Sequence, residues 1–255
     1  MNVVAAVIPA FNEEATIRDV VGRALRQVAR VIVVDDGSCD GTSAALAGMP
    51  VTVLRNERNC GKAHSLMRGM EEAFRHGAAA VVTLDGDGQH APEEIPRLLS
   101  ALRAEPRSIA IGSRLHDAPN IPLDRYLANC FANFWIGWAA GHRIDDSQSG
   151  FRVYSEAAWR EVLSRCGTQG FVLESEALIE AGRAGFRLVA VPVAAIYATR
   201  ARRSHFRPVL DIVRIARMVS WKLLSGGLYL SGLIRFLRDD RLERAEASRE
   251  VGPTG

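Results

Sequence analysis

The sequence predicts an α/β protein with a mostly parallel central sheet and helices on both faces of that sheet. Short apolar runs alternate with stretches of helical periodicity along the 255-residue chain, and a crossover helix is what joins neighbouring parallel strands. Several of the apolar runs are continuous rather than alternating, which is typical of strands that are buried on both faces. Polar loops rich in aspartate and glycine follow some of these runs directly.

The individual elements follow from these patterns in chain order. We expect strands at residues 2–8, 31–34, 51–54, 79–85, 108–114 and 188–197. We expect helices at residues 13–28, 41–47, 61–76 and 91–104. The first helix has apolar residues at helical spacing from Ile17 to Val28, and the last opens on Pro92 followed by two glutamates, a common helix start.

The bulk composition is that of a globular protein, with 48% hydrophobic and 24% charged residues, and the length suits one large α/β domain or two small ones. The formal net charge of +3 is too balanced to indicate a nucleic-acid partner. The four cysteines have no zinc-like spacing and indicate reduced thiols, and the N-terminus lacks the basic start of a signal peptide. We therefore expect a cytoplasmic protein.

Three polar loops each follow a predicted strand, at residues 9–13, 35–42 and 85–90. In an open parallel sheet, ligands bind beyond the carboxyl ends of the strands. The three loops are therefore expected to meet at one edge of the sheet. Three acidic loops at one edge are hard to explain as ordinary solvated surface, so this edge is the predicted site.

In the third loop, Asp85 and Asp87 flank a single glycine directly after a buried run. Two carboxylates at such a short separation repel each other unless a cation or a proton lies between them. Mg²⁺ or Mn²⁺ prefers oxygen ligands of this kind and keeps open positions for substrate phosphates, and Gln89 could add an amide oxygen. The plain alternative is a polar turn after a strand, and His90 is expected to be structural.

The second loop begins with Asp35 and Asp36 at a strand end, followed by Gly37, which permits a turn. One interpretation is simple strand–turn–helix chemistry. The other is a carboxylate that accepts hydrogen bonds from a nucleotide base. The loop has neither the GxGxxG nor the GxxxxGK pattern, so dinucleotide-binding and P-loop interpretations are disfavoured.

Six stretches of the chain resemble, in order, the motifs of family 2 glycosyltransferases: VIPAFNEE, VVDDGSCDGT, NCGKAHSLMRGM, TLDGDGQHAPEEIPRL, IGSR and DDSQSGFRVY. The resemblance covers roughly residues 3–210 and is closest to the dolichyl-phosphate mannosyltransferase-like, or polyprenyl-phosphate glycosyltransferase, branch. It implies a GT-A fold and a nucleotide-diphosphate sugar donor. The order of the six motifs makes it specific.

The resemblance also implies roles for individual residues. It assigns to nucleotide binding Pro9, Ala10, Asn12, Glu13, Asp36, Lys62, Asp85 and Gly86, with Asp36 on the base. It assigns to the Mg²⁺ or Mn²⁺ ion Asp85, Asp87 and Gln89. The catalytic candidates are Asp87, Asp146 and Arg114.

For a lipid-phosphate acceptor, the resemblance implies Arg114, Arg125, Asn129, Arg202 and Ser204. Asn129 stands where the family usually has serine, and the register of Arg202 is open because the family's glycine is absent there. The alternative for Arg114 and Arg125 is surface salt bridging. A phosphate acceptor is largely anionic at neutral pH and needs alignment more than a base, whereas a hydroxyl acceptor would need one, with Asp146 the candidate.

The function implied is an inverting, metal-dependent glycosyltransferase that moves a sugar from a GDP- or UDP-sugar to a polyprenyl phosphate. The alternative is a related transferase acting on a glycolipid or soluble hydroxyl. Two other classes are disfavoured. The metal-ligand pattern argues against a catalytically dead sugar-nucleotide-binding module, and the acidic first loop argues against a nucleotidyltransferase.

Three segments are expected: a GT-A domain at 1–208, an amphipathic helical segment at 209–237 and a charged flexible tail at 238–255. Residues 200–217 hold six arginines and one acid, which suits anionic lipid headgroups. The longest charge-free apolar run, residues 223–234, is too short to span a bilayer, so peripheral attachment to the cytoplasmic membrane is favoured. The alternative is packing on the core or on a second copy in a homo-oligomer.

Overall fold

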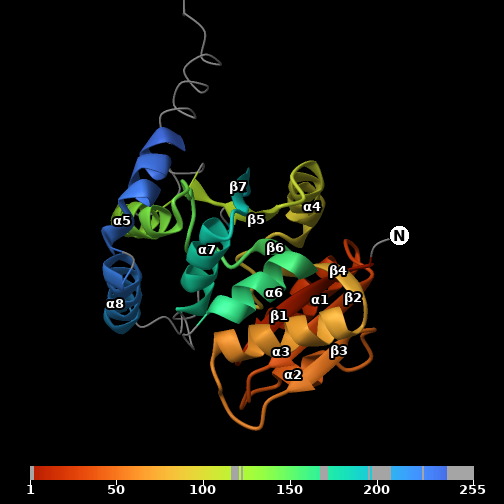
Figure 1. Ribbon diagram of the computed structural model, residues 1–255. Helices are drawn as coiled ribbons and strands as arrows, with labels where there is room; N and C mark the ends of the chain where they lie inside the picture. The colour runs from red at the N-terminus through yellow and green to blue at the C-terminus, as the bar shows by residue number, and fades with distance from the viewer. Residues whose placement is uncertain are drawn as a thin grey trace, which may run out of the picture.

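The computed structural model describes residues 3–115, 121, 123–166, 172–194, 196, 208–225 and 227–239 (Figure 1). Its strands are β1 (Val3–Ala10), β2 (Arg30–Asp35), β3 (Thr52–Arg55), β4 (Ala78–Thr83), β5 (Ser108–Ser113), β6 (Arg152–Ser155) and β7 (Arg187–Pro192). Its helices are α1 (Ile17–Leu25), α2 (Thr42–Ala45), α3 (Lys62–Arg75), α4 (Ile95–Ala104), α5 (Leu123–Ala140), α6 (Glu156–Arg165), α7 (Leu173–Arg183) and α8 (Pro208–Ser225). The short 3₁₀ helices η1 (Pro92–Glu94) and η3 (Gly227–Tyr229) precede α4 and a last helix at 230–239.

The described strands form one seven-stranded sheet in the order β3-β2-β1-β4-β6-β5-β7. β1 pairs in parallel with both β2 and β4, and β2–β3 and β5–β7 are also parallel. The prediction of a mostly parallel sheet is therefore confirmed. The exception is β6, which runs antiparallel to β4 and β5 and places Arg152 beside Thr83 at the carboxyl end of β4.

Helices cover both faces of the sheet, as predicted. On one face α3, α5, α6 and α7 enclose a core cluster that includes Val7, Val34, Met70, Ile136 and Leu178. On the other face α1 and α4 enclose a second cluster that includes Ile8, Ile17, Val33, Leu98 and Val153. Alternate residues of β1 and β2 belong to the two clusters, because successive side chains of a strand point to opposite faces.

The first four predicted helices and the predicted strands are present, with bounds that shift by at most five residues. Four elements between residues 123 and 183 were not expected from the sequence: α5, β6, α6 and α7. α5 and α7 pack against each other in the first core cluster. They have apolar residues on several sides, so they lack the clean periodicity of an amphipathic surface helix.

One face of α8 packs on the core through Met218, Val219 and Leu223, which are at most 7% exposed. Lys222 Nζ forms ion pairs of 2.8 Å with Glu176 and with Glu180 on α7. The described part of the segment predicted at 209–237 is thus helical and has a protein-facing side, which fits the alternative of core packing for that side. No described helix combines the length and apolarity required to cross a bilayer.

Candidate active site

The three polar loops lie at one edge of the sheet, because β2, β1 and β4 are adjacent and parallel. The Asp36 N–H donates to the Ala10 carbonyl oxygen at 2.8 Å, which ties the ends of β1 and β2 together. The Thr16 hydroxyl, just before α1, donates to the Gly86 carbonyl oxygen at 2.7 Å. The loop of Asp85 and Asp87 is therefore anchored to the same edge, as the sequence predicted.

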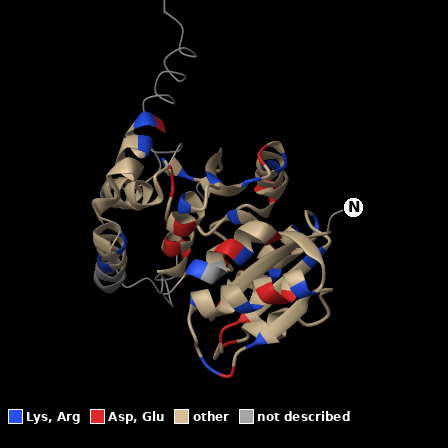
Figure 2. Ribbon diagram, in the orientation of Figure 1, with Lys and Arg blue, Asp and Glu red and all other residues tan. Residues whose placement is uncertain are grey.

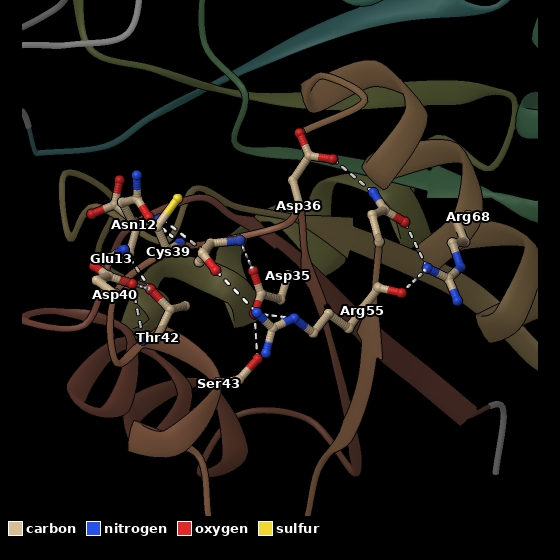
Figure 3. A network of polar contacts seen from close by, with 12 residues as sticks. Asn12, Glu13, Asp35, Asp36, Cys39, Asp40, Thr42, Ser43, Arg55 and Arg68 are labelled. Carbon is tan, nitrogen blue, oxygen red and sulfur yellow. Dashed lines mark hydrogen bonds and ion pairs between the residues drawn. The ribbon is translucent and has the colours of Figure 1, made fainter. Parts of the chain in front are cut away.

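The loop after β1 is interlocked with the loop after β2 (Figure 3). The Asn12 N–H donates to Ser38 Oγ at 2.9 Å, and Asn12 Oδ1 accepts from the Cys39 N–H at 2.8 Å. The Glu13 N–H donates to Thr42 Oγ1 at 2.7 Å. Asn12 has a φ of 58°, a left-handed conformation that asparagine tolerates better than most residues. These contacts hold Asn12 and Glu13 in fixed positions beside the carboxyl end of β1.

Asp36 is 3% exposed, and it organises the loop that leads into α3. Its carboxylate accepts from Asn56 Nδ2 at 2.7 Å, the Cys60 N–H at 2.9 Å and the Gly61 N–H at 2.8 Å. Lys62 follows immediately as the first residue of α3. A carboxylate has further lone pairs, so a contact with a nucleotide base stays a prediction. What the structure adds is that Asp36 also positions Lys62, a role that the sequence did not suggest.

Asp35, in contrast, stabilises the turn between β2 and α2. It is fully buried and accepts from the Ser38 N–H at 2.8 Å and from the Ser43 hydroxyl. Gly37 has a φ of 74°, and a methyl group there would lie 2.5 Å from the Arg58 carbonyl carbon. For Asp35 and Gly37 the simple strand–turn–helix interpretation is therefore sufficient.

Three charged side chains converge around Gly150. Lys62 Nζ lies 2.7 Å from Asp85 Oδ1 and 3.2 Å from Glu174 Oε2. A methyl group at Gly150 would lie 2.8 Å from Lys62 Nζ, 3.2 Å from Asp85 Oδ2 and 3.2 Å from Glu174 Oε1. Glycine at this position leaves the space in which the three groups meet. Glu174 could not be singled out from the sequence, because acidic residues are common in the first turn of any helix.

The charges of this cluster shift the pKa values of its members. Burial alone would raise the pKa of Asp85, but the charge and hydrogen bond of Lys62, together with His90 and Arg114, outweigh burial and lower that pKa to about 2. Burial opposes the charge on Lys62, and the carboxylates of Asp85 and Glu174 more than compensate, so its pKa is raised. Both groups of the ion pair are therefore charged at neutral pH.

Asp87 lies in a different environment from Asp85. Its pKa is raised, first by burial and then by the negative charge of Asp85. Its Oδ1 accepts from the Gln89 N–H at 3.0 Å, and its Oδ2 accepts from Gln89 Nε2 at 2.6 Å. The negative charge of Asp85 thus disfavours the charged form of Asp87, and this is the condition under which a cation between them is stabilising.

The donor set fits a hard divalent cation that also takes ligands from a substrate. Two carboxylates and an amide oxygen are ligands that Mg²⁺ and Mn²⁺ accept, and both ions commonly bind through one or two carboxylates plus phosphate oxygens. Within the described part of the chain, no three His, Cys, Asp or Glu side chains converge as a metal site. Gln89 would have to turn its amide oxygen towards the ion, because its nitrogen faces Asp87 here.

His90 is structural, as expected. It is 3% exposed, stacks on Phe151 at 5.3 Å between ring centroids, and its Nδ1 accepts from the Asp85 N–H at 3.1 Å. Burial lowers its pKa from the ordinary 6.5 to about 4. The neutral ring therefore supports the backbone of the acidic loop.

We expect His90 to make stability fall as the pH falls from about 6.5 towards 4. In this window the unfolded chain binds a proton at His90 and the folded chain does not, so stability is greatest above the unfolded pKa. The loss between pH 7 and pH 5 should be on the order of 1–2 kcal/mol. Urea unfolding at both pH values, with EDTA present, measures it. His90→Asn retains an acceptor but does not titrate, so its pH dependence should be smaller by that amount; equal slopes for both proteins would contradict this assignment.

Arg114 and Asp146 form an ion pair at the end of β5. Asp146 is fully buried, and its carboxylate accepts from Arg114 Nε at 2.9 Å and from the Arg114 N–H and Nη2 at 3.2 Å each. This geometry indicates that Asp146 orients Arg114 and does not act as a free base. The structure thus brings together two of the predicted catalytic residues.

The other predicted acceptor residues are placed only in part. Asn129 is half-buried on α5, and the next turn of that helix carries Asn133, whose Oδ1 accepts from the Ser147 N–H at 2.8 Å. The side chain of Arg125 lies outside the described part of α5, and Arg202 and Ser204 lie outside the described residues. Their assignment to an acceptor phosphate stays a prediction.

Arg152 connects β6, the preceding loop and α7. It is 1% exposed and donates to the carbonyl oxygens of Ser149 at 2.7 Å, Ser147 at 2.9 Å and Glu174 at 2.6 Å. The resemblance included this arginine, but its role was not evident from the sequence. These three hydrogen bonds hold Gly150 and the start of α7 at the carboxyl end of β4.

Comparison with known proteins identifies the family of this chain. The family model described as glycosyl transferase family 2 matches residues 5–165. The chain therefore belongs to glycosyltransferase family 2, and it is a glycosyltransferase. This confirms the family that the sequence motifs resembled.

Two relatives are named for lipid-phosphate acceptors. The chain is 34% identical over 200 residues to the polyprenol monophosphomannose synthase of Mycolicibacterium smegmatis, which covers 73% of this chain and 75% of that protein. It is 29% identical over 212 residues to the UDP-N-acetylglucosamine–dolichyl-phosphate N-acetylglucosaminyltransferase of Methanococcus voltae, covering 75% of this chain and 84% of that protein.

Among solved structures, the chain is similar to glucosyl-3-phosphoglycerate synthase from Mycobacterium tuberculosis in complex with UDP, with a TM-score of 0.63. The identity is 24%, and the match covers 88% of this chain and 79% of that chain. The same synthase has been solved with Mn²⁺, UDP and phosphoglyceric acid, with a TM-score of 0.61 at 24% identity, over 88% of this chain and 78% of that chain. At this identity the likeness shows the fold, which is GT-A.

Proposed function

We propose that the protein transfers a sugar, with inversion, from a GDP- or UDP-sugar to a polyprenyl phosphate, with Mg²⁺ or Mn²⁺ held by Asp85 and Asp87. The observation that carries this proposal is the meeting of two acidic side chains with the Asn12 and Asp36 loops at one sheet edge. The names of the relatives support the acceptor class. A divalent cation there would neutralise the charge that develops on the leaving nucleoside diphosphate.

Each loop has a part in donor binding under this proposal. The β1 loop, with Pro9, Ala10, Asn12 and Glu13, and the Asp36 carboxylate form the nucleotide side. Gly86 lies close to α1 and β1, since a methyl group there would lie 3.2 Å from Ile17 Cδ1 and 3.4 Å from the Pro9 carbonyl oxygen. Lys62, charged at neutral pH, supplies a cation for the diphosphate.

The acceptor part of the proposal rests on Arg114. Its guanidinium is oriented by the buried Asp146 and is suited to hold a phosphate, together with Arg125, Asn129, Arg202 and Ser204. An acceptor phosphate has a second pKa of about 6 and is already anionic at neutral pH, so it needs alignment more than deprotonation. A hydroxyl acceptor would need a base, and Asp146 is engaged with Arg114, which argues against that alternative.

A nucleotide panel followed by a transfer assay tests the proposal. We expect GDP or UDP with Mn²⁺ to raise the melting temperature, and the corresponding radiolabelled nucleotide sugar to label polyprenyl phosphate. Stabilisation by a nucleotide without any transfer to polyprenyl phosphate, but with transfer to a soluble hydroxyl compound, would favour the alternative acceptor. No response to any nucleotide would contradict the donor assignment.

We also propose peripheral attachment at the cytoplasmic face of the membrane, through an exposed apolar surface on α5 and the C-terminal helices. On α5 it comprises Leu123, Leu127, Phe131 and Phe134, and on the C-terminal helices Trp221, Leu224, Leu228, Leu230, Ile234 and Leu237. The two parts are adjoining, since Phe134 and Phe236 pack at 5.6 Å and Trp138 Nε1 donates to the Leu228 carbonyl oxygen at 3.2 Å. α5 is almost free of charge in Figure 2.

This surface has the features of an interfacial helix pair. Leu127 and Phe131 are 58% and 63% exposed and lie one turn apart, which is unusual for a solvated helix face. The exposed Arg235 and Arg238 on the last helix suit anionic headgroups. Tyr229 in η3 is half-buried, with the guanidinium of Arg183 5.0 Å from its ring centroid.

We expect the double variant Leu127→Ser, Phe131→Ser to bind anionic liposomes at least about tenfold less well than the wild type. Burying each of these side chains contributes roughly 1.5–3 kcal/mol, so their loss exceeds the 1.4 kcal/mol of a tenfold change. Sedimentation with phosphatidylglycerol vesicles measures it. The matched control is Val53→Ser on the edge strand β3, where Val53 is 40% exposed. Wild-type protein that ignores vesicles but dimerises through this surface would support the homo-oligomer alternative instead.

A further inference from the structure

Lys62 and a divalent cation would compete for the same carboxylate. Lys62 Nζ lies 2.7 Å from Asp85 Oδ1, an oxygen that the proposed function assigns to the metal. Asp85 is 28% and Lys62 22% exposed at the side chain, so the pair is only partly screened by solvent. For Asp85 to bind a cation at full strength, the Lys62 ammonium must move away from it and still keep a carboxylate that balances its charge.

Glu174 is placed to provide that compensation. Its Oε2 is 3.2 Å from Lys62 Nζ, so the ammonium already lies between two carboxylates. Asp85, Glu174 and Lys62 together carry a charge of −1, and Asp87 adds a second negative charge, which a divalent cation would balance. The three groups meet over Gly150, where the missing side chain leaves the ammonium room to shift from one carboxylate to the other.

The position of Glu174 is fixed by the fold. Arg152 donates to the Glu174 carbonyl oxygen at 2.6 Å and to the Ser149 carbonyl oxygen at 2.7 Å, so one buried side chain sets both the start of α7 and the loop of Gly150. The Glu174 side chain is 18% exposed, and its carboxylate contacts the Lys62 ammonium. This arrangement is more specific than a surface ion pair.

We propose that Glu174 is a positioning residue that holds the Lys62 ammonium when Asp85 turns to the divalent cation. The inference rests on the proposed function and extends it. Lys62 remains in the site, bound to Glu174 and available to the donor diphosphate, while Asp85 is released. Without the Glu174 charge, the ammonium depends on Asp85 alone and resists displacement by the cation.

Binding of Mn²⁺ alone, followed through the EPR signal of the free ion, tests the inference without requiring turnover. We expect Glu174→Gln to bind Mn²⁺ about tenfold more weakly than the wild type, and Glu174→Asp, which keeps the charge, to recover part of the affinity. Lys62→Met removes the competitor. In that background Glu174→Gln should change the affinity less than twofold, because the double-mutant cycle isolates the coupling between the two residues.

The outcomes separate this inference from the proposed function. An equal loss in both backgrounds would show that Glu174 acts on Mn²⁺ through its own charge, and would overturn the inference while leaving the metal site in place. A wild-type protein that binds no Mn²⁺ would remove the metal from the proposed function, and the inference with it. Glu161→Gln, which changes a 38% exposed carboxylate on α6, is the control for the substitution itself and should bind like the wild type.

Discussion

Replacing Asp87 with alanine is expected to lower sugar transfer roughly a thousandfold while leaving the fold intact. A cation at this site stabilises the developing diphosphate charge by several kcal/mol, and about 4 kcal/mol corresponds to a thousandfold in rate. The fold should tolerate the change, because burial and Asp85 both disfavour the charged form of Asp87. Removing this carboxylate therefore relieves the repulsion with Asp85, and the cost to the fold is limited to the two hydrogen bonds from Gln89.

Two measurements check this prediction. Transfer of radiolabelled sugar gives the rate, and isothermal titration of Mn²⁺ with a nucleoside diphosphate gives the affinity, which should fall in parallel. Asp19→Ala is the matched control, since Asp19 is 73% exposed on α1 and pairs only at 3.4 Å with Arg23 one turn away. Undiminished Mn²⁺ binding by Asp87→Ala would sink the metal assignment.

Replacing Arg152 with methionine is expected to destabilise the protein by about 3 kcal/mol or more. The change leaves the carbonyl oxygens of Ser147, Ser149 and Glu174 without their donor, and each buried unpaired group costs roughly 1–3 kcal/mol. Methionine fills much of the volume of the arginine stem, so the loss reports on the hydrogen bonds more than on a cavity. For a protein of this size, the melting temperature should fall by roughly 6–12 °C.

Differential scanning calorimetry and urea unfolding measure this loss. The control is Arg160→Met on α6, which removes a 76% exposed arginine whose partner is Glu156 one turn earlier. Exposed pairs of this kind contribute little, so its stability should change by less than about 0.5 kcal/mol. Similar losses in the two variants would mean that Arg152 is not the connection between the Gly150 loop and α7 that the structure indicates.

The sequence by itself determined the fold class and the edge of the sheet where the site lies. Strands buried in a parallel sheet are apolar along most of their length, and the loops that follow them all begin at the carboxyl edge of the sheet. The loops of Asn12, Asp36 and Asp87 therefore had to lie at the same edge. The ordered motifs then identified the family. These features are local, because each depends on a strand and the loop that directly follows it.

Only the tertiary structure decided how the charges of the site are paired. β6 runs against its neighbours, which brings Gly150 and Arg152 to the carboxyl end of β4. α7 then places Glu174 against Lys62. The loop that precedes β6 places Asp146 against Arg114. Pairings between segments that are far apart in the sequence depend on tertiary packing. A glutamate in the first turn of a helix does not by itself indicate which distant residue it will contact.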